Sequence, residues 1–317
     1  MRIALLGGTR FIGRTIAAEL AAAGHDLLLC HRGENEPDDL PAAAHAHLDR
    51  RDVAGLRAAL AGRDALVDTC ALSRADAETA LAAAPEARLL VLSSMDVYRA
   101  YSALHAGGES QAVPLDESSP LRTERYPYRG VMPGLDDYEK IEVEEAYLAR
   151  GATVLRLPMV YGEHDYQRRE EFVLRRVRAG RSRIPIGAGN WLWTRGYAGD
   201  IARAVRLALE REVSGEVLNL GERRTASMER WAHDILDAAG STAELVRVPD
   251  ALLPDDMKLT AGIAQHMLVD SSRARALLGW EPEDAQATLR RSVAWHLAHP
   301  PADQVGFEAD DRALAAA

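Results

Sequence analysis

The stretch GGTRFIG, residues 7–13, decides the fold. It directly follows an apolar run at 2–6 and opens an amphipathic stretch at 11–22. Gly7 has the conformational freedom that a tight turn after a strand requires, and Gly13 lets a helix pack closely on that strand. The first turn of such a helix presents free N–H groups and the positive end of its dipole to an anion. The pattern therefore predicts a strand, a glycine-rich turn and a helix that bind the pyrophosphate of a dinucleotide.

Two departures from the usual dinucleotide pattern indicate which cofactor is bound. Arg10 replaces the middle glycine, and its guanidinium can supply positive charge to a phosphate. The next predicted strand ends in CHRG (30–33), where His31 and Arg32 stand in place of the acidic residue that holds the ribose of NAD. Arginine suits a 2′-phosphate, so the sequence favours NADP over NAD. The alternative is that Arg32 is a solvated loop residue and that the pocket accepts either cofactor.

Short apolar runs and amphipathic runs alternate through the first 160 residues. The predicted strands are 2–6, 26–30, 44–48, 65–69, 88–94 and 153–157, and the predicted helices between them are 11–22, 53–61, 74–84 and 136–149. Strands with few polar positions that alternate with helices predict a parallel sheet covered on both faces. The fold class is therefore α/β, a Rossmann doubly wound parallel sheet with a smaller α/β substrate domain.

The later part of the chain predicts that substrate domain and its borders. The predicted elements there are helices at 200–210, 227–238, 272–278 and 286–298 and strands at 216–220 and 244–248. The segment 100–134 is rich in proline and glycine, and a loop of this length is typical of an active-site border. We assign 1–158, with about 192–221, to the cofactor domain and about 159–191 and 222–300 to the substrate domain. Residues 301–317 are expected to be a loose tail or an interface helix.

Composition disfavours several classes of function. The 317 residues carry a formal net charge of −10, which disfavours nucleic acid and anionic membranes as partners. The N-terminus enters a strand directly, and we expect a cytoplasmic protein whose two cysteines are buried thiols. The pairs His45/His47 and His296/His299 lack companions in the sequence, so no metal site is predicted.

Seven motifs, in order, resemble the extended short-chain dehydrogenase/reductase superfamily of the NAD-dependent epimerase/dehydratase type. They are GGTRFIG (7–13), HLDRRD (47–52), LSSMDVY (92–98), LRLPMVYG (155–162), YAGDIARA (197–204), GEVLNLG (215–221) and LGWEP (278–282). The resemblance covers about residues 1–298. The glycine motif is most similar to an atypical branch that also includes chloroplast stem-loop-binding proteins. The resemblance implies a nucleotide sugar as substrate and a homodimer as the assembly.

The resemblance also implies roles for individual positions. Ser94 matches the residue that hydrogen-bonds the reacting oxygen. Lys140 matches the lysine that holds the nicotinamide ribose and lowers the pKa of a tyrosine four residues before it. The cofactor-binding residues expected from the glycine motif and the resemblance together are Gly7, Thr9, Arg10, Phe11, Ile12, Gly13, His31, Arg32, Asp49, Cys70, Ala71, Lys140, Pro158 and Val160.

The tyrosine that should accompany Lys140 is missing from its expected position. Lys140 and Lys258 are the two lysines of the chain, and the residues four before them are Asp136 and Pro254. Residues four apart share one face of a helix, so Asp136 and Lys140 are expected to meet. Tyr138 is two residues from Lys140 and would point elsewhere on the same helix.

Three hypotheses for the proton-transfer group follow. Asp136 acts beside Lys140 and Ser94, or a tyrosine of the border segment supplies the phenol, or the pair of Asp136 and Lys140 only holds a site that binds without turnover. Tyr128 is included among the predicted catalytic residues, and the tyrosines in or next to the border segment are Tyr98, Tyr101, Tyr126 and Tyr128.

Arginines and tryptophans are the candidates on the substrate side. Arg168 just beyond the sheet edge suits a phosphate or carboxylate, although a solvated helix face is an equal alternative. Trp193 and Arg195 in GNWLWTRGY (189–197) can stack on a base or sugar ring, or can be core residues. The sequence thus predicts an NADP-dependent oxidoreductase, reductase or epimerase/dehydratase, acting at a hydroxyl or carbonyl carbon. A cofactor-bound sensor or RNA-binding protein on the same fold is the alternative.

Overall fold

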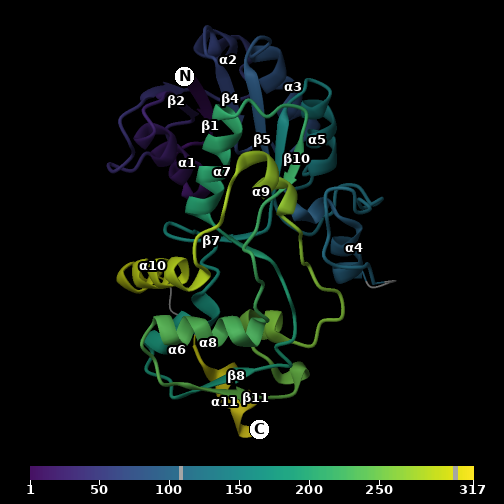
Figure 1. The fold of residues 1–317 in the computed structure, drawn as a ribbon. Coiled ribbons are helices and arrows are strands. Elements are labelled where there is room, and N and C mark those ends of the chain that lie inside the picture. The colour runs from purple at the N-terminus through teal and green to yellow at the C-terminus, as the bar shows by residue number, and fades with distance from the viewer. Residues whose placement is uncertain (107–109, 303–305) are drawn as a thin grey trace.

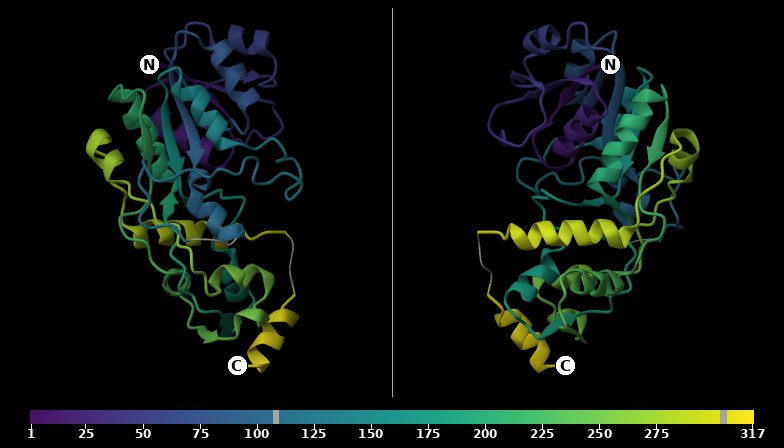
Figure 2. Two further views of the ribbon diagram at one scale, coloured as in Figure 1. Left: turned by 90° about the vertical axis from the view of Figure 1, so that its right-hand side faces the viewer. Right: turned by 60° about the vertical axis from the view of Figure 1, so that its left-hand side comes forward.

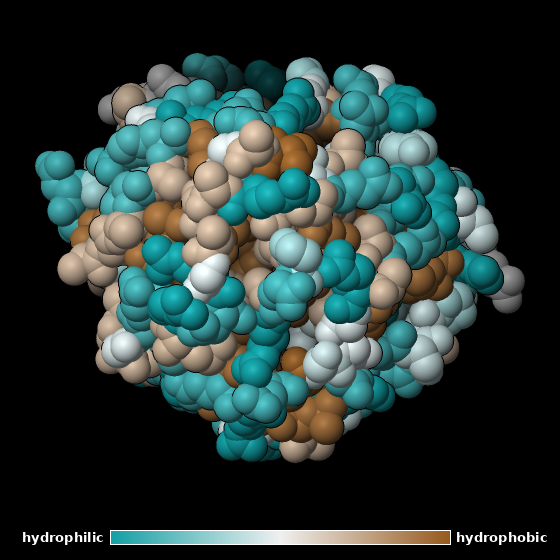
Figure 3. All heavy atoms as spheres, turned by 90° about the horizontal axis from the view of Figure 1, so that it is seen from above, coloured by the Kyte–Doolittle hydropathy of each residue, from teal (hydrophilic) through white to brown (hydrophobic). Residues whose placement is uncertain are grey.

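The computed structural model describes residues 1–106, 110–302 and 306–317, arranged in an upper and a lower part (Figure 1). The upper part contains the N-terminus and the large sheet, and the lower part contains the C-terminus. Helix α10 (Ala285–Ala298) lies between the two parts in all views (Figure 2). On the face seen from above, apolar residues are interspersed among hydrophilic ones (Figure 3). None of the helices in the described ranges combines the length and apolar character needed to span a bilayer.

Seven parallel strands form the sheet of the upper part, in the order β10-β6-β5-β4-β1-β2-β3. They are β1 (Arg2–Leu6), β2 (Asp26–His31), β3 (Ala44–His47), β4 (Ala65–Asp68), β5 (Arg88–Ser94), β6 (Thr153–Leu157) and β10 (Val217–Asn219). The chain runs from β1 to one edge of the sheet and then returns to β4 on the other side of β1. The loops that leave β1 and β4 therefore diverge, and a crevice is expected at this switch point.

Helices cover both faces of the sheet because alternate strand residues point to opposite sides. The helices on the first face are α1 (Phe11–Ala22), α7 (Ala198–Glu210) and α9 (Ser272–Leu278), and those on the second are α2 (Val53–Leu60), α3 (Arg74–Ala83) and α5 (Lys140–Leu148). Ile3 and Leu5 of β1 are buried with the first group, and Ala4 and Leu6 with the second. The predicted doubly wound Rossmann-type sheet is confirmed.

The lower part has its own core, built from helices and two short parallel strand pairs. Its elements are β7 (Met159–Tyr161), α6 (Glu171–Arg178), β8 (Arg183–Ile186), β9 (Arg195–Tyr197), α8 (Met228–Ala238), β11 (Glu244–Arg247), the 3-10 helices η2 (Asp250–Leu252) and η3 (Asp255–Thr260), and α11 (Glu308–Ala315). The exact division into two domains stays a prediction. Trp280, beyond α9, is buried in the core of the large sheet rather than in that of the lower part.

Three predicted segments differ from the observed elements. The border segment 100–134 starts inside helix α4 (Arg99–Ala106), which follows the 3-10 helix η1 (Met95–Val97), and its residues 107–109 lie outside the described ranges. The helix expected at 136–149 begins only at Lys140. The tail forms α11, whose buried Asp310 pairs with Arg176 of α6, so over these residues it is a docked helix rather than a loose end.

Candidate active site

A cavity of about 790 Å³ opens at the switch point of the sheet. Its walls are the glycine turn after β1, the end of β2 and the loops after β3 and β4, with Tyr166 and Gln167 from the chain beyond β7. The predicted cofactor residues that line it are Gly7, Thr9, Arg10, Phe11, Ile12, Gly13, His31, Arg32, Asp49 and Cys70. The structure thus brings together the residues of four separate segments that the sequence assigned to one cofactor.

The glycine turn has the close geometry that the sequence predicted. Gly7 has φ +86°, and an added Cβ there would lie 2.6 Å from Oγ1 of Thr69. A Cβ on Gly13 would lie 2.0 Å from the carbonyl oxygen of Gly7. Arg10 precedes α1 without a side-chain cap, so the first N–H groups of the helix are left for another acceptor. This cradle fits the pyrophosphate of a dinucleotide.

Arginines surround the cavity, and one of them was missed by sequence reasoning. Arg50 lies beneath it, 2.7 Å from Oδ2 of the buried Asp68 and 3.1 Å from Sγ of Cys70. Burial raises the pKa of Cys70 to about 12, so this side chain is a neutral thiol at neutral pH. Arg32 is exposed and pairs with Glu34 at 2.9 Å, and both line the cavity. The motif HLDRRD held the signal for Arg50, because its arginines follow the predicted strand directly.

A second group of polar side chains lies where β5 ends. Asp96 in η1 is only 4% exposed, and its Oδ2 accepts hydrogen bonds from the hydroxyls of Tyr138, at 2.7 Å, and Tyr128, at 3.2 Å. The Tyr138 hydroxyl also interacts with Ser94. The hydroxyls of Tyr128 and Tyr101 are 2.8 Å apart. Three tyrosines and one carboxyl therefore converge next to the serine that the sequence singled out.

Burial controls the protonation of this group. It raises the pKa of Asp96, and the hydrogen bond from Tyr138 only partly offsets the effect. Burial and the neighbouring Asp96 raise the pKa of Tyr138 well above its ordinary value. Oδ1 of Asp96 has no hydrogen-bond partner among the described residues. The Tyr138 hydroxyl thus donates a hydrogen bond to a buried carboxyl that keeps one oxygen free, an arrangement that suits proton transfer.

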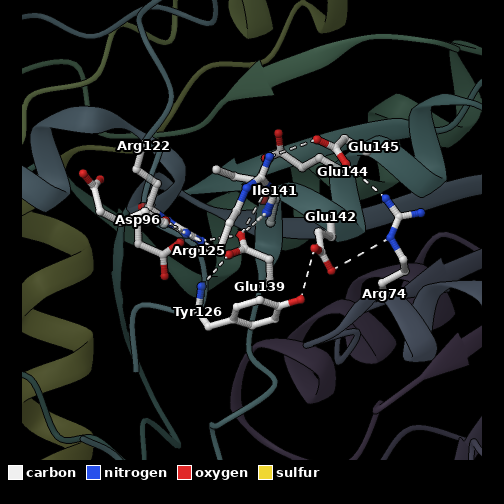
Figure 4. A network of polar contacts seen from close by, with 12 residues as sticks. Arg74, Asp96, Arg122, Arg125, Tyr126, Glu139, Ile141, Glu142, Glu144 and Glu145 are labelled. Atoms are coloured by element: carbon white, nitrogen blue, oxygen red, sulfur yellow. Dashed lines mark hydrogen bonds and ion pairs between the residues drawn. The ribbon is translucent and has the colours of Figure 1, made fainter. Parts of the chain in front are cut away.

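Glu139 explains why Tyr138 reaches this position. Its Oε1 accepts the backbone N–H of Ile141 at 3.0 Å and caps α5, and both its oxygens bind Arg122, at 2.6 and 2.9 Å (Figure 4). Because α5 begins at Lys140, Tyr138 precedes the helix. The expectation that it points away from the site is therefore wrong, and the angular argument behind it does not apply.

The expected contact between Asp136 and Lys140 is also wrong. Asp136 is exposed, and its Oδ1 accepts the backbone N–H of Gly130 at 2.9 Å. Lys140 is buried and donates to the carbonyl oxygens of Ala71, at 2.6 Å, and Leu92, at 2.9 Å. The helical geometry that made Asp136 a catalytic or ion-pairing candidate is absent because the chain at 136–139 is not helical.

The candidates on the substrate side separate into different environments. Trp193 is partly buried, and its indole N–H lies 3.1 Å from Sδ of Met95, next to Asp96. Arg195 is buried and pairs with Glu222 at 3.1 Å, so it does not face an open cleft and fits the alternative of a core residue.

Two neighbouring arginines, Arg168 and Arg169, lie in different environments. Arg168 lies against α10, where it donates to the carbonyl oxygen of His299. Arg169 instead lies 5.9 Å from the ring centroid of Trp193. The sequence could not distinguish them, because the positive φ of Arg168, +48°, turns the chain between them.

The remaining predicted cofactor residues lie outside the cavity wall. Ala71, Pro158 and Val160 are buried after β4 and β6, at the same end of the sheet as Ser94. Their contact with a nicotinamide stays a prediction, as does that of Lys140.

The fold and the glycine turn at the switch point define an α/β protein of the dinucleotide-binding class. A model of the NAD dependent epimerase/dehydratase family matches residues 3–221, and the chain belongs to this family.

Known proteins similar to this chain come from several organisms. The chloroplast stem-loop binding protein of 41 kDa b from Arabidopsis thaliana is 26% identical over 304 residues, covering 89% of this chain and 75% of that protein. UDP-glucose 4-epimerase from Thermotoga maritima, solved with UDP-glucose, has a TM-score of 0.71 at 18% identity, covering 93% of this chain and 98% of that one. dTDP-glucose 4,6-dehydratase from Bacillus anthracis, solved with NAD, has a TM-score of 0.71 at 16% identity, covering 94% and 97%.

Proposed function

We propose that this protein is an NADP-dependent enzyme that oxidises a hydroxyl carbon or reduces a carbonyl carbon of a nucleotide sugar, within an epimerisation, a dehydration or a net reduction. The observation that carries the proposal is the hydrogen bond of 2.7 Å from Tyr138 to the buried Asp96, next to Ser94. It supplies a phenol and a base at the position where the family's usual tyrosine spacing is absent.

The residues divide the proton chemistry between them. The Ser94 and Tyr138 hydroxyls hydrogen-bond the reacting oxygen of the substrate. As a substrate hydroxyl is oxidised, its proton passes to the Tyr138 oxygen while the Tyr138 proton passes to Asp96, and the return step reverses both transfers. Since the pKa of Tyr138 is raised, a free phenolate is avoided, and the raised pKa of Asp96 makes it a better base than an ordinary aspartate.

The cavity holds the cofactor through its glycine turn and arginines. When bound, the nicotinamide would accept or return the hydride at the reacting carbon. The free N–H groups of α1 and Arg10 would hold the pyrophosphate, and Lys140, which has three N–H donors and directs two at carbonyl oxygens, can direct the third at a ribose hydroxyl. Arg32 and Arg51 line the cavity and support the preference for a 2′-phosphate.

A comparison of binding affinities tests the cofactor preference. NADP and NAD affinities are compared by quenching of protein fluorescence in the wild type and in Arg32→Ala. NADP should bind more tightly to the wild type, and the variant should lose about tenfold of that affinity while its affinity for NAD changes little. Glu34→Gln is the control in the opposite direction, because it removes the carboxylate that pairs with Arg32 and leaves the guanidinium free for the 2′-phosphate. If the wild type bound NAD more tightly than NADP, the proposed preference for NADP would be wrong.

Substrate recognition is proposed for the pair of Trp193 and Arg169. An aromatic ring beside a guanidinium suits a base or sugar ring that carries a diphosphate. The solved structures with bound UDP-glucose and NAD support a nucleotide sugar by similarity of fold.

Turnover on a panel of UDP- and dTDP-sugars tests the catalytic assignment. Tyr138→Phe should lower kcat by about a hundredfold or more, with cofactor affinity preserved, because it removes only one hydroxyl. Asp136→Asn is the matched control, two residues away and exposed, and should keep full activity. The assignment fails if Tyr138→Phe turns over normally or if Asp136→Asn abolishes turnover.

The rival function, RNA binding, has less support from the charges. Four of the arginines at 168–183 are engaged by carboxylates rather than free to form a basic patch: Arg175 and Arg176 with Asp256 and Asp310, Arg178 with Glu171, and Arg181 with Asp311. Steeply salt-dependent binding of a stem-loop RNA, without turnover on any sugar nucleotide, would favour the rival.

A further inference from the structure

Three histidines and a glutamate converge at the edge of the sheet, outside the group that moves protons. His31 ends β2, and His45 and His47 stand two apart on the edge strand β3, so both face the same side. His31 is the register partner of His47 in this parallel pair, which places its ring on that side too. Glu36 comes from the bend between the two strands. The expectation that His45 and His47 lack companions is therefore wrong.

The ligand atoms of these residues are close enough to share one ion. Nε2 of His31 is 2.8 Å from Nδ1 of His45, and the two Glu36 oxygens are each 3.0 Å from a histidine nitrogen, of His45 and of His47. One ligand atom from each residue lies within 4.8 Å of all the others. Around a tetrahedral zinc ion with bonds of about 2.0–2.1 Å, ligand atoms are about 3.3 Å apart. Small side-chain rotations are therefore sufficient to form a four-ligand site.

Protons alone do not satisfy all of the nitrogen and oxygen atoms that face one another in this cluster. Nδ1 of His45 faces both another ring nitrogen and a carboxylate oxygen, and a single N–H cannot point well at both. Gly33 donates its backbone N–H to Nδ1 of His31 at 3.1 Å, which in a neutral ring places the His31 proton on Nε2, toward His45. Nδ1 of His45 then accepts that proton with its single lone pair, and no proton is left between it and the Glu36 oxygen 3.0 Å away. A cation at the centre accepts all of these lone pairs at once, and the exposed bend at Gly33 releases its contact when the His31 proton moves to Nδ1.

We infer that His31, Glu36, His45 and His47 form a binding site for one divalent cation of the zinc class. Three imidazoles and a carboxylate suit zinc or cobalt rather than magnesium or calcium, which prefer oxygen ligands. The site is at the surface, since Glu36 and His47 are exposed, so an ion can enter directly. His31 also lines the large cavity, so the ion would sit at its rim.

Titration of the untagged full-length chain, freed of metal by a chelator, tests the site. Zn²⁺ is followed by calorimetry and Co²⁺ by the visible absorption that marks tetrahedral coordination. We expect one ion per chain, with Zn²⁺ displacing Co²⁺. His45→Gln, His47→Gln and Glu36→Gln should each weaken binding by at least about tenfold, since even the outer partners of metal ligands typically contribute that much.

Two control variants keep the result specific. His25→Gln removes a histidine that lies 3.4 Å from the N-terminal amine, a competing donor pair, and His233→Gln removes an exposed helical histidine. Both should bind like the wild type, and circular dichroism checks that every variant is folded. The inference is overturned if the wild type shows no saturable binding of one ion, or if His45→Gln and His47→Gln retain wild-type affinity. Because the titrations contain no cofactor or substrate, their failure would leave the proposed catalytic function untouched.

Discussion

Tyr138 shows at the scale of the single residue how a spacing rule can misplace a proposed catalytic group. The rule of four residues assumes that 136–140 is helical, whereas Glu139 caps the helix and starts it at Lys140. Glutamate is not among the preferred N-cap residues, and this one is held by Arg122, 17 positions earlier. The sequence therefore predicted Ser94 and Lys140 beside one another in the fold, but neither Tyr138 nor Asp96, whose roles depend on a distant contact.

The raised pKa of Asp96 predicts a distinctive pH profile. As the base, Asp96 must be unprotonated, so kcat/KM should fall as the pH drops, with a midpoint above the ordinary range of an aspartate. Asp96→Asn should lower kcat by about a hundredfold or more and abolish that acidic limb. Steady-state rates from pH 4 to 9 measure both effects. An unshifted limb in the variant would show that another group titrates.

Gly13 provides a second test at this scale, on the cofactor side. Gly13→Ala would push a methyl group onto the Gly7 carbonyl, so α1 must move away from β1. We expect a loss of about 1–3 kcal/mol in the free energy of unfolding, together with most of the affinity for dinucleotide. Gly180→Ala is the control, because its φ of +66° adds backbone strain in open space far from the cavity. Equal losses of cofactor affinity in both variants would contradict the role of the turn.

Among the elements, α5 is held to the border segment by one buried ion pair. Arg122 and Glu139 are both inaccessible to solvent, and Glu139 also accepts the N–H of Tyr126 at 2.7 Å. Glu139→Gln leaves Arg122 charged and buried, so unfolding in urea should show a loss of about 3–5 kcal/mol. Glu142→Gln, on the same helix and hydrogen-bonded to the Tyr126 hydroxyl, should lose less than about 1 kcal/mol. Similar losses in the two variants would show that the buried ion pair contributes no more to stability than the contacts of Glu142.

The elements of the large sheet were predictable, and those of the lower part were less so. Strands such as 2–6 and 88–94 are largely apolar runs between turns, and this pattern can be recognised in the sequence without knowing which strands pair. Strands β7 and β9 have three residues each and exist because they pair with each other, with register partners such as Met159 and Arg195 that are 36 positions apart. Such short, non-local pairings leave little trace in sequence periodicity.

For the molecule as a whole, a buried pair predicts how stability depends on pH: Oε2 of Glu170, just before α6, lies 3.7 Å from Nε2 of His296 in α10. Burial raises the pKa of Glu170 to about 7, and burial together with Arg168 lowers the pKa of His296 to about 4. Protonated Glu170 stabilises the fold below its unfolded pKa, and this contribution is lost as the pH rises through 7. Neutral His296 stabilises above its unfolded pKa of 6.5, and this is lost as the pH falls toward 4. The two trends oppose each other.

Wild-type stability should therefore change little from this pair between pH 4.5 and 6.5. Glu170→Gln should expose the histidine's trend, with the free energy of unfolding rising by up to about 3 kcal/mol from pH 4 to 6.5. His296→Gln should show the opposite slope, with stability falling toward pH 7. Urea unfolding at a series of pH values measures each slope. Parallel profiles in all three proteins would show that the pair is not linked to folding.

The burial of Lys140 gives the chain a chemical property beyond catalysis. The side chain of Lys258 is 66% exposed, whereas Lys140 is 6% exposed and donates to two carbonyl groups. An acylating reagent should therefore label Lys258 quickly and Lys140 only when α5 lifts from the sheet. Mass spectrometry of the Lys140 label would then measure how often the candidate active site opens, with no engineered probe.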